Sequence, residues 1–165
     1  MSSARRLQSR MKRLYDESQA DLTDTDALEC LGPLDDSDLT HWRAVMKGSP
    51  GTPYEHGRWL LDIQASQDYP FSPPHVTFNT RICHPNVKFE TGKICLDILD
   101  RNDAWSPAFT ISTTLTCIHQ LLSNPVWDSP LNMDLAVLHK NDKLGAESVV
   151  RYYCDTERWE RESLR

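Results

Sequence analysis

Proline is confined to the middle of this chain. All ten prolines lie between Pro33 and Pro130, so the first 32 residues and the last 35 contain none. Because proline breaks helix interiors, this distribution predicts helices at both ends, with strands and turns between them. That order is typical of the α+β class. We find no internal repeat, low-complexity tract or Gly/Ser linker, so residues 1–165 are expected to form a single domain.

Apolar spacing places the individual elements. One stripe of an amphipathic N-terminal helix is formed by Ala4, Leu7, Met11 and Leu14. Four strand-like pieces follow at residues 27–31, 41–46, 58–65 and 76–78, and their short connections favour an antiparallel meander. The first is expected to end at Gly32-Pro33. Three later patterns, at residues 111–122, 133–141 and 146–153, predict helices. Residues 82–109 show little periodicity, and irregular stretches of that length tend to be functional.

Composition excludes several classes of function. The net charge of −6, from 24 acids and 18 bases, argues against nucleic-acid binding, which needs a basic surface. No apolar run approaches the roughly 20 residues of a membrane span, and the first residues do not resemble a secretory signal. The five cysteines have separations of 53, 12, 22 and 37, which match neither a zinc site nor a disulfide framework. We therefore expect reduced thiols, a cytosolic location and no metal.

The irregular stretch holds the sharpest chemical pattern. His84-Pro85-Asn86 is followed, nine residues after Asn86, by Cys95-Leu96-Asp97. A turn at Thr91-Gly92 would bring the Asn86 amide near the Cys95 sulfur. A cysteine beside an amide donor suits acyl transfer, because the tetrahedral intermediate needs a hydrogen bond on its oxyanion. On spacing alone, a buried apolar role for the cysteine is the more common alternative.

The other candidates for chemistry have simpler interpretations. A histidine before proline is expected to pin the backbone, and no nearby residue completes a protease triad with His84. Cys117 and Cys154 lie in helical segments among apolar neighbours and are expected to fill the core. Cys30 ends a strand candidate. Cys83 could lie near Cys95, but an ordinary packed thiol is favoured over a redox role.

Four motifs, in this order and at this spacing, resemble the ubiquitin-conjugating enzymes. They are Tyr69-Pro70-Phe71-Ser72-Pro73-Pro74, His84-Pro85-Asn86, Cys95-Leu96-Asp97-Ile98-Leu99 and Trp105-Ser106-Pro107. The resemblance runs from about Ala4 to Trp159, and residues 87–95 and 128–132 look most like the peroxisomal members. It implies an N-terminal helix, a four-stranded antiparallel meander, an active-site loop and three further helices. The order of elements expected from the residues agrees with that fold.

The resemblance also implies roles for particular residues. Cys95 would hold the ubiquitin C-terminus as a thioester, and Asn86 would stabilise the oxyanion or fix the loop. The implied catalytic set is Cys95, Asn86, Asp97 and Asp128, with His84, Pro85, Ser129 and Leu131 supporting the active-site loop. Because Asp97 disfavours a thiolate at Cys95, the pattern suits a carrier whose partners position each transfer better than a protease nucleophile.

Two surfaces are implied as docking sites. The activating enzyme would bind the basic helix face, formed by Arg5, Arg6, Arg10, Lys12 and Arg13. A RING-type ligase would grip exposed aromatic and proline residues, namely Phe71, Pro73, Trp105, Ser106, Pro107 and Ala108. The alternatives are a solvated helix face for the first set and simple loop packing for the second. No cofactor is implied, because the activating enzyme consumes the ATP.

Three departures from the family pattern stand out. The Asn86–Cys95 loop is one residue longer than in many members, and the ten-residue separation of Cys95 and Trp105 is two longer than the commonest spacing. Ser129 stands where many members carry an acid before the Pro130-Leu131 pair, and Asp128 precedes it. The loop length resembles the peroxisomal type, whereas the ten-residue separation is shared by the conjugating enzyme for SUMO.

We therefore expect a ubiquitin-conjugating enzyme at the cytosolic face of the peroxisomal membrane. It would be recruited there by a membrane-anchored peroxin and would modify an import receptor. The C-terminal Ser163-Leu164-Arg165 is not the Ser-Lys-Leu matrix signal. The alternatives are a SUMO-conjugating enzyme, a non-catalytic ubiquitin-binding variant of the fold, and a thiol hydrolase. Cys95 argues against the non-catalytic variant, and the missing general base argues against the hydrolase.

Overall fold

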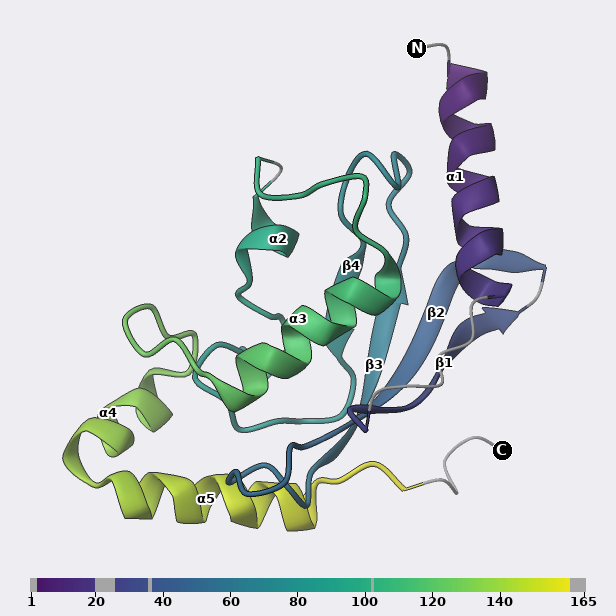
Figure 1. The fold of residues 1–165 in the computed structure, drawn as a ribbon. Coiled ribbons are helices and arrows are strands. Elements are labelled where there is room, and N and C mark those ends of the chain that lie inside the picture. The colour runs from purple at the N-terminus through teal and green to yellow at the C-terminus, as the bar shows by residue number, and fades with distance from the viewer. Residues whose placement is uncertain (1–2, 20–25, 36, 102, 161–165) are drawn as a thin grey trace.

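The computed structural model describes residues 3–19, 26–35, 37–101 and 103–160. Its helices and strands are, in chain order, α1 (Ser3–Gln19), β1 (Leu28–Asp35), β2 (Asp38–Lys47), β3 (Arg58–Gln64), β4 (His75–Phe78), α2 (Asp97–Asp100), α3 (Ile111–Ser123), α4 (Met133–Asn141) and α5 (Lys143–Thr156). α3 crosses one face of the sheet, while α4 and α5 lie beyond the end of α3 (Figure 1). The expected α+β class and order of elements are confirmed.

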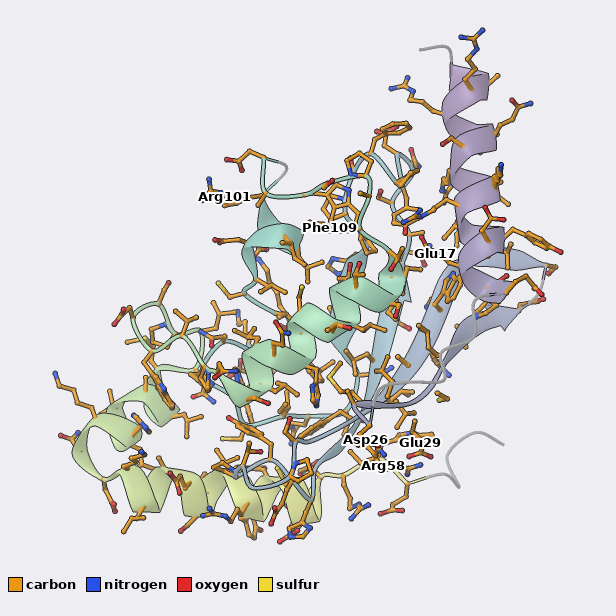
Figure 2. The ribbon with its side chains drawn as sticks, in the orientation of Figure 1. Glu17, Asp26, Glu29, Arg58, Arg101 and Phe109 are labelled. Atoms are coloured by element: carbon orange, nitrogen blue, oxygen red, sulfur yellow. The ribbon has the colours of Figure 1, made fainter. Side chains whose placement is uncertain are left out.

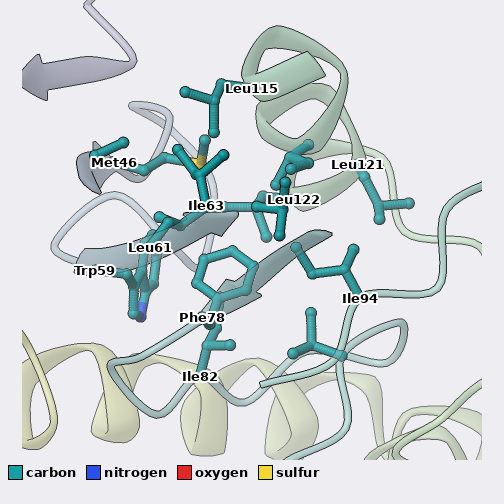
Figure 3. Close-up of a cluster of buried hydrophobic side chains, with 14 of the residues drawn as sticks. Met46, Trp59, Leu61, Ile63, Phe78, Ile82, Ile94, Leu115, Leu121 and Leu122 are labelled. Carbon is teal, nitrogen blue, oxygen red and sulfur yellow. The ribbon is translucent and has the colours of Figure 1, made fainter. Parts of the chain in front are cut away.

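The sheet is an antiparallel meander in which consecutive strands pair, in the order β1-β2-β3-β4. β2 and β3 pair in register from His41↔Gln64 to Lys47↔Arg58. Alternate β3 residues, Trp59, Leu61 and Ile63, are almost completely buried, and they belong to one core cluster with Leu115 and Leu122 of α3 (Figure 3). Each such side chain contributes about 1.5–3 kcal/mol by burial, so this face of the sheet and α3 form the rigid frame of the molecule.

The first strand does not end where the sequence predicted. β1 runs through Gly32 and Pro33 to Asp35, and Pro33 lies opposite Trp42 of β2. The reason is the position of β1 at the edge of the sheet, where a residue that lacks an N–H donor can be accommodated. β2 begins three residues earlier than expected, because the hairpin with β1 extends to Asp38.

The N-terminal helix packs on the body through only part of its predicted apolar stripe. Leu14 is completely buried, whereas Leu7 and Met11 are exposed. The first turns of α1 project beyond the sheet (Figure 1). At the other end of α1, Glu17 lies beside the start of α3 (Figure 2), where its carboxylate accepts a hydrogen bond from the Ile111 N–H. α1 is therefore anchored at its C-terminal end.

The irregular stretch is ordered by short pairings rather than by long elements. Thr77 bridges to Lys93, Val87 bridges to Ile94, and α2 spans only four residues. Gly92 has φ +69°, and a Cβ there would lie 1.9 Å from the Phe78 carbonyl oxygen. Only glycine fits this turn without strain, and the predicted turn at Thr91-Gly92 is confirmed.

Candidate active site

His84 holds the start of the active-site loop. Its side chain is completely buried, its Nδ1 accepts from the Asn86 N–H (3.0 Å), and its Nε2 therefore donates to the Leu121 carbonyl (3.2 Å). Burial lowers the pKa of His84 to about 3, although backbone hydrogen bonds partly oppose the shift. The imidazole is neutral, and both of its nitrogens are occupied. The predicted pinning role is confirmed, and His84 cannot serve as a base for Cys95.

Asn86 connects three parts of the site. Its carbonyl accepts from the Cys95 N–H (2.8 Å), so the chain doubles back as predicted. Its side-chain amide donates to the Val126 carbonyl (2.6 Å), and its Oδ1 accepts from the Val126 N–H (2.8 Å). With only 2% of its surface exposed, Asn86 holds the loop between α3 and α4 beside Cys95. In this state, its amide bonds to the loop and not to an oxyanion.

Cys95 is half-buried and lies just before α2. Burial raises the pKa of its thiol, the carboxylates of Asp100 and Asp97 raise it further, and Lys93 partly opposes them. Both acids disfavour the thiolate by repulsion. Asp100 also accepts from the Leu96 N–H (3.2 Å), which holds its carboxylate close to the cysteine. Asp97 therefore raises the pKa of Cys95, as predicted, and Asp100 raises it more than Asp97 does.

The segment 128–132 is attached to the same loop. The Pro85 carbonyl accepts from the N–H groups of Leu131 (2.7 Å) and Asn132 (3.0 Å). Asn132 then caps α4 by accepting from the Leu135 N–H (3.1 Å). Asp128 and Ser129 are exposed between Val126 and these anchors. These hydrogen bonds attach the segment to the active-site loop at Leu131 and Asn132, whereas Asp128 and Ser129 are exposed and their predicted roles stay predictions.

Known proteins are similar to this chain in sequence. The family model for ubiquitin-conjugating enzymes matches residues 11–154. The ubiquitin-conjugating enzyme E2 16 of Schizosaccharomyces pombe is 43% identical over 147 residues, which are 88% of this chain and 91% of that protein. The ubiquitin-conjugating enzyme E2 pex4 of Dictyostelium discoideum is 43% identical over 151 residues, covering 91% and 95%.

The chain belongs to the ubiquitin-conjugating enzyme family. It is a transferase that works through a cysteine thioester. The crystal structure of the H. polymorpha ubiquitin-conjugating enzyme Pex4p, in complex with the soluble domain of Pex22p, superposes with a TM-score of 0.83 at 34% identity. That match covers 92% of this chain and 100% of the other.

The expected ligase surface of this ubiquitin-conjugating enzyme is only partly exposed. Phe71 is 39% exposed, and Pro107 and Ala108 lie at the surface, whereas Pro73 and Ser106 are half-buried. The expectation that Trp105 is exposed is wrong, because only 7% of its surface is accessible. Its indole donates to the Pro70 carbonyl (2.8 Å) and contacts the rings of Tyr69 and Phe109. Trp105 therefore joins the two loops that carry the exposed residues.

The basic residues of α1 do not form one open ridge. Arg5 and Lys12 are exposed, and Arg6 is exposed 3.9 Å from Asp68. Arg13 is directed at the body, where it bonds to Glu17 (2.6 Å) and to the Ala108 carbonyl (3.1 Å). Arg10 is half-buried, and within the described ranges its Nε has no hydrogen-bond partner. The two half-buried arginines are thus less available to an acidic partner than the sequence predicted.

The remaining cysteines follow their predicted environments with one exception. Cys83 and Cys154 are buried, Cys30 is exposed, and Cys117 is only half-buried because its position on α3 faces partly outward. Burial raises the pKa of Cys83 to about 11. Burial also raises the pKa of Cys154 to about 12, with smaller contributions from Asp155 and Cys83. All five thiols are free. Among the described residues, no three His, Cys, Asp or Glu side chains are grouped to hold a metal, and no helix is long and apolar enough to cross a membrane.

Sequence reasoning missed the residues that act through the backbone or through stacking. Val126 contributes only its peptide groups, so no pattern in the sequence identifies it. Trp127 stacks on His139, with ring centroids 3.7 Å apart and planes 10° from parallel. Asp100 could have been found, because it lies three residues after Asp97, at the spacing of one helical turn.

Proposed function

We propose that this enzyme accepts ubiquitin on Cys95 and passes it, with a RING-type ligase, to a receptor for peroxisomal import. The observation that carries the first part is the hydrogen bond from the Cys95 N–H to the Asn86 carbonyl. That bond folds the chain back so that the partly accessible Cys95 lies beside the Asn86 backbone. The Asn86 side chain in turn bonds to Val126, in the loop that also carries Asp128 and Ser129. Among the thiols in the described ranges, only Cys30 is exposed, and it lies on the edge strand β1.

The proposed reaction has two steps on the same carbonyl carbon. In the first, the Cys95 thiol loses its proton, its sulfur bonds to the C-terminal carbonyl carbon of ubiquitin, and the cysteine of the activating enzyme leaves as a thiolate that takes up a proton. In the second, an acceptor amine or thiol bonds to that carbon and loses its proton, and Cys95 leaves as a thiolate. Each intermediate carries an oxyanion, which a positioned amide donor stabilises. The activating enzyme uses the ATP, so this chain requires no cofactor.

The electrostatics of Cys95 support a carrier rather than a hydrolase. Burial, Asp100 and Asp97 raise the pKa of the thiol, whereas a hydrolytic cysteine needs a lowered pKa and a nearby base. His84, the histidine closest to Cys95 in the sequence, is neutral, with both ring nitrogens bonded. A thiol of this kind reacts when a partner enzyme positions an activated carbonyl against it.

The docking surfaces are assigned by resemblance and supported by exposure. Phe71, Pro107 and Ala108 present a rigid exposed edge, held from behind by Trp105, for the ligase. Arg5, Arg6 and Lys12 present positive charge on α1 for the activating enzyme. The Arg13 side chain bonds to the Ala108 carbonyl, so α1 contacts the proposed ligase surface at that residue.

The peroxisomal role rests on the named relatives. The Dictyostelium relative is named pex4, and the H. polymorpha structure is of Pex4p with the soluble domain of Pex22p. We therefore infer a peripheral location on the cytosolic face of the peroxisomal membrane, with recruitment by a membrane-anchored peroxin. The substrate would be an import receptor that is recycled after ubiquitination.

The test is thioester formation with purified activating enzyme, ATP and either ubiquitin or SUMO. Wild type should form a thiol-sensitive adduct with ubiquitin only. Cys95→Ala should lose it, Cys95→Ser should give an adduct that survives thiols, and the matched control Cys30→Ala should behave as wild type. A thiol-sensitive ubiquitin adduct that persists in Cys95→Ala would refute the assignment of Cys95. If the enzyme is charged with SUMO but not with ubiquitin, the proposed function is wrong and the enzyme is a SUMO-conjugating enzyme.

A further inference from the structure

The loop between α3 and α4 is held at two adjacent residues. Asn86 bonds to both backbone groups of Val126. The next residue, Trp127, stacks on His139 of α4, with ring centroids 3.7 Å apart and 10° between the rings. The loop is thus held by one side chain of the active-site loop and by one side chain of α4.

The stacked pair borders a cavity that opens to solvent. This cavity has a volume of about 350 Å³, and Tyr54, Pro125, Leu135, Trp127 and His139 are among the residues that line it. Because the cavity is open and not filled by packed side chains, it gives the loop room to shift. The parallel stack is the specific contact that opposes such a shift, since it fixes the distance between Trp127 and α4.

The contacts form one continuous series that ends at the catalytic cysteine. His139 contacts Trp127, which is covalently joined to Val126. Val126 bonds to the Asn86 side chain, and the Asn86 carbonyl accepts from the Cys95 N–H. Because the Asn86 amide donates to the Val126 carbonyl, the position of the loop determines where that amide lies relative to the sulfur.

We propose that His139 is a positioning residue for ubiquitin discharge, which acts on Asn86 through the Trp127 stack. The proposal rests on the proposed function in assigning discharge to the Cys95–Asn86 site. α4 forms its own capped helix, anchored by Asn132, so it provides a fixed base for the stack. Loss of the stack lets the loop move toward the cavity and carries the Asn86 amide away from the reacting carbonyl. Small misplacements of this kind lower rates without abolishing binding.

The experiment compares single-turnover discharge of ubiquitin-charged enzyme to free lysine and to free cysteine. His139→Ala should slow both discharges by about three- to tenfold, the range set by the worth of one aromatic pair, with charging by the activating enzyme unchanged. His139→Phe should restore the rate, because a phenyl ring can stack on Trp127. Lys140→Ala, an exposed change at the next position of α4, is the matched control and should match wild type.

A merely structural role would give a different pattern. The effect of His139→Ala should vanish in an Asn86→Ala background, because the proposed route ends at that amide. In NMR spectra, the Asn86 side-chain amide should exchange with solvent faster in His139→Ala and at the wild-type rate in His139→Phe. Parallel losses of charging, discharge and melting temperature would overturn the proposal, as would full additivity with Asn86→Ala.

Failure of the proposed function would look different again. If Asn86→Ala discharges at the wild-type rate, the oxyanion role of Asn86 fails. If charging persists at another cysteine, the Cys95 assignment fails. In both cases, the exchange of the Asn86 side-chain amide still reports whether the stack holds it, and unchanged exchange in His139→Ala refutes the positioning claim by itself. If His139→Ala does not fold, Trp127→Leu provides the same comparison, with Trp127→Phe as its stacking control.

Discussion

His84 should make the stability of this enzyme depend on pH in a range where few other groups titrate. Its pKa is lowered to about 3 by complete burial, whereas a histidine in an unfolded chain titrates near 6.5. Above pH 6.5 both states are neutral, and the residue adds no dependence on pH. As the pH falls below 6.5, the unfolded chain binds a proton that the folded chain does not, so stability is lost progressively down to about pH 3.

The magnitude follows from that difference. Each pH unit between the two pKa values is worth about 1.4 kcal/mol, so the free energy of unfolding should fall by about 2 kcal/mol between pH 7 and pH 5 because of His84 alone. That is a large share of an ordinary domain's 5–15 kcal/mol. Carboxylates with lowered pKa values, such as Asp35 and Asp38, change the stability mainly below pH 5, since their pKa values in the unfolded chain lie near 4. His119, whose pKa burial also lowers, acts in the same direction as His84.

The assay is urea unfolding, followed by tryptophan fluorescence at constant ionic strength and at several pH values from 7 to 5. His84→Gln removes the titration and should be less stable than wild type at pH 7, but the gap should narrow by about 2 kcal/mol at pH 5. His56→Gln, which removes an exposed histidine, is the control for a general effect of substitution. Equal pH slopes in wild type and His84→Gln would refute the argument, as would a measured His84 pKa near 6.5.

Three further outcomes are expected. Asn86→Ala should leave charging nearly intact but slow discharge by roughly 10²–10³; joint loss of charging and folding would show that the two bonds to Val126 are its main role. Phe71→Ala should abolish ligase-stimulated discharge with normal charging, and a lower melting temperature as the chief effect would favour loop packing. The Cys95 thioester should discharge to free cysteine faster than to free lysine, beyond the roughly hundredfold set by intrinsic ionisation, and Ser129→Asp should raise only the lysine rate. Single-turnover assays from pH 6.5 to 9 test this, and equal rates for Ser129→Asp and wild type would contradict it.

The sequence alone determined the order of the elements and one turn of the active-site loop, because the conformational preferences of proline and glycine dominate in those segments. Proline at the centre and its absence at the ends separated strands from helices, and the order of elements agrees with the structure. Residues 133–141 were predicted with the bounds that α4 has. The Thr91-Gly92 turn was predicted because glycine suits such turns, and the chain doubles back there so that the Cys95 backbone bonds to the Asn86 backbone.

Only the tertiary structure decided which side chains are available and what holds them. An aromatic residue followed by Ser106 and Pro107 looks exposed, yet Trp105 is buried because it contacts two other rings and bonds to the Pro70 carbonyl. Pro33 looked like the end of a strand, yet β1 continues past it. An edge strand has one unpaired side, so it can accommodate a residue that lacks the backbone N–H. The bonds of Asn86 to Val126 and the stack of Trp127 on His139 join residues distant in sequence. Their partners are a peptide group and a ring face, which leave no local pattern, so they exist only once α3, α4 and the active-site loop have packed together.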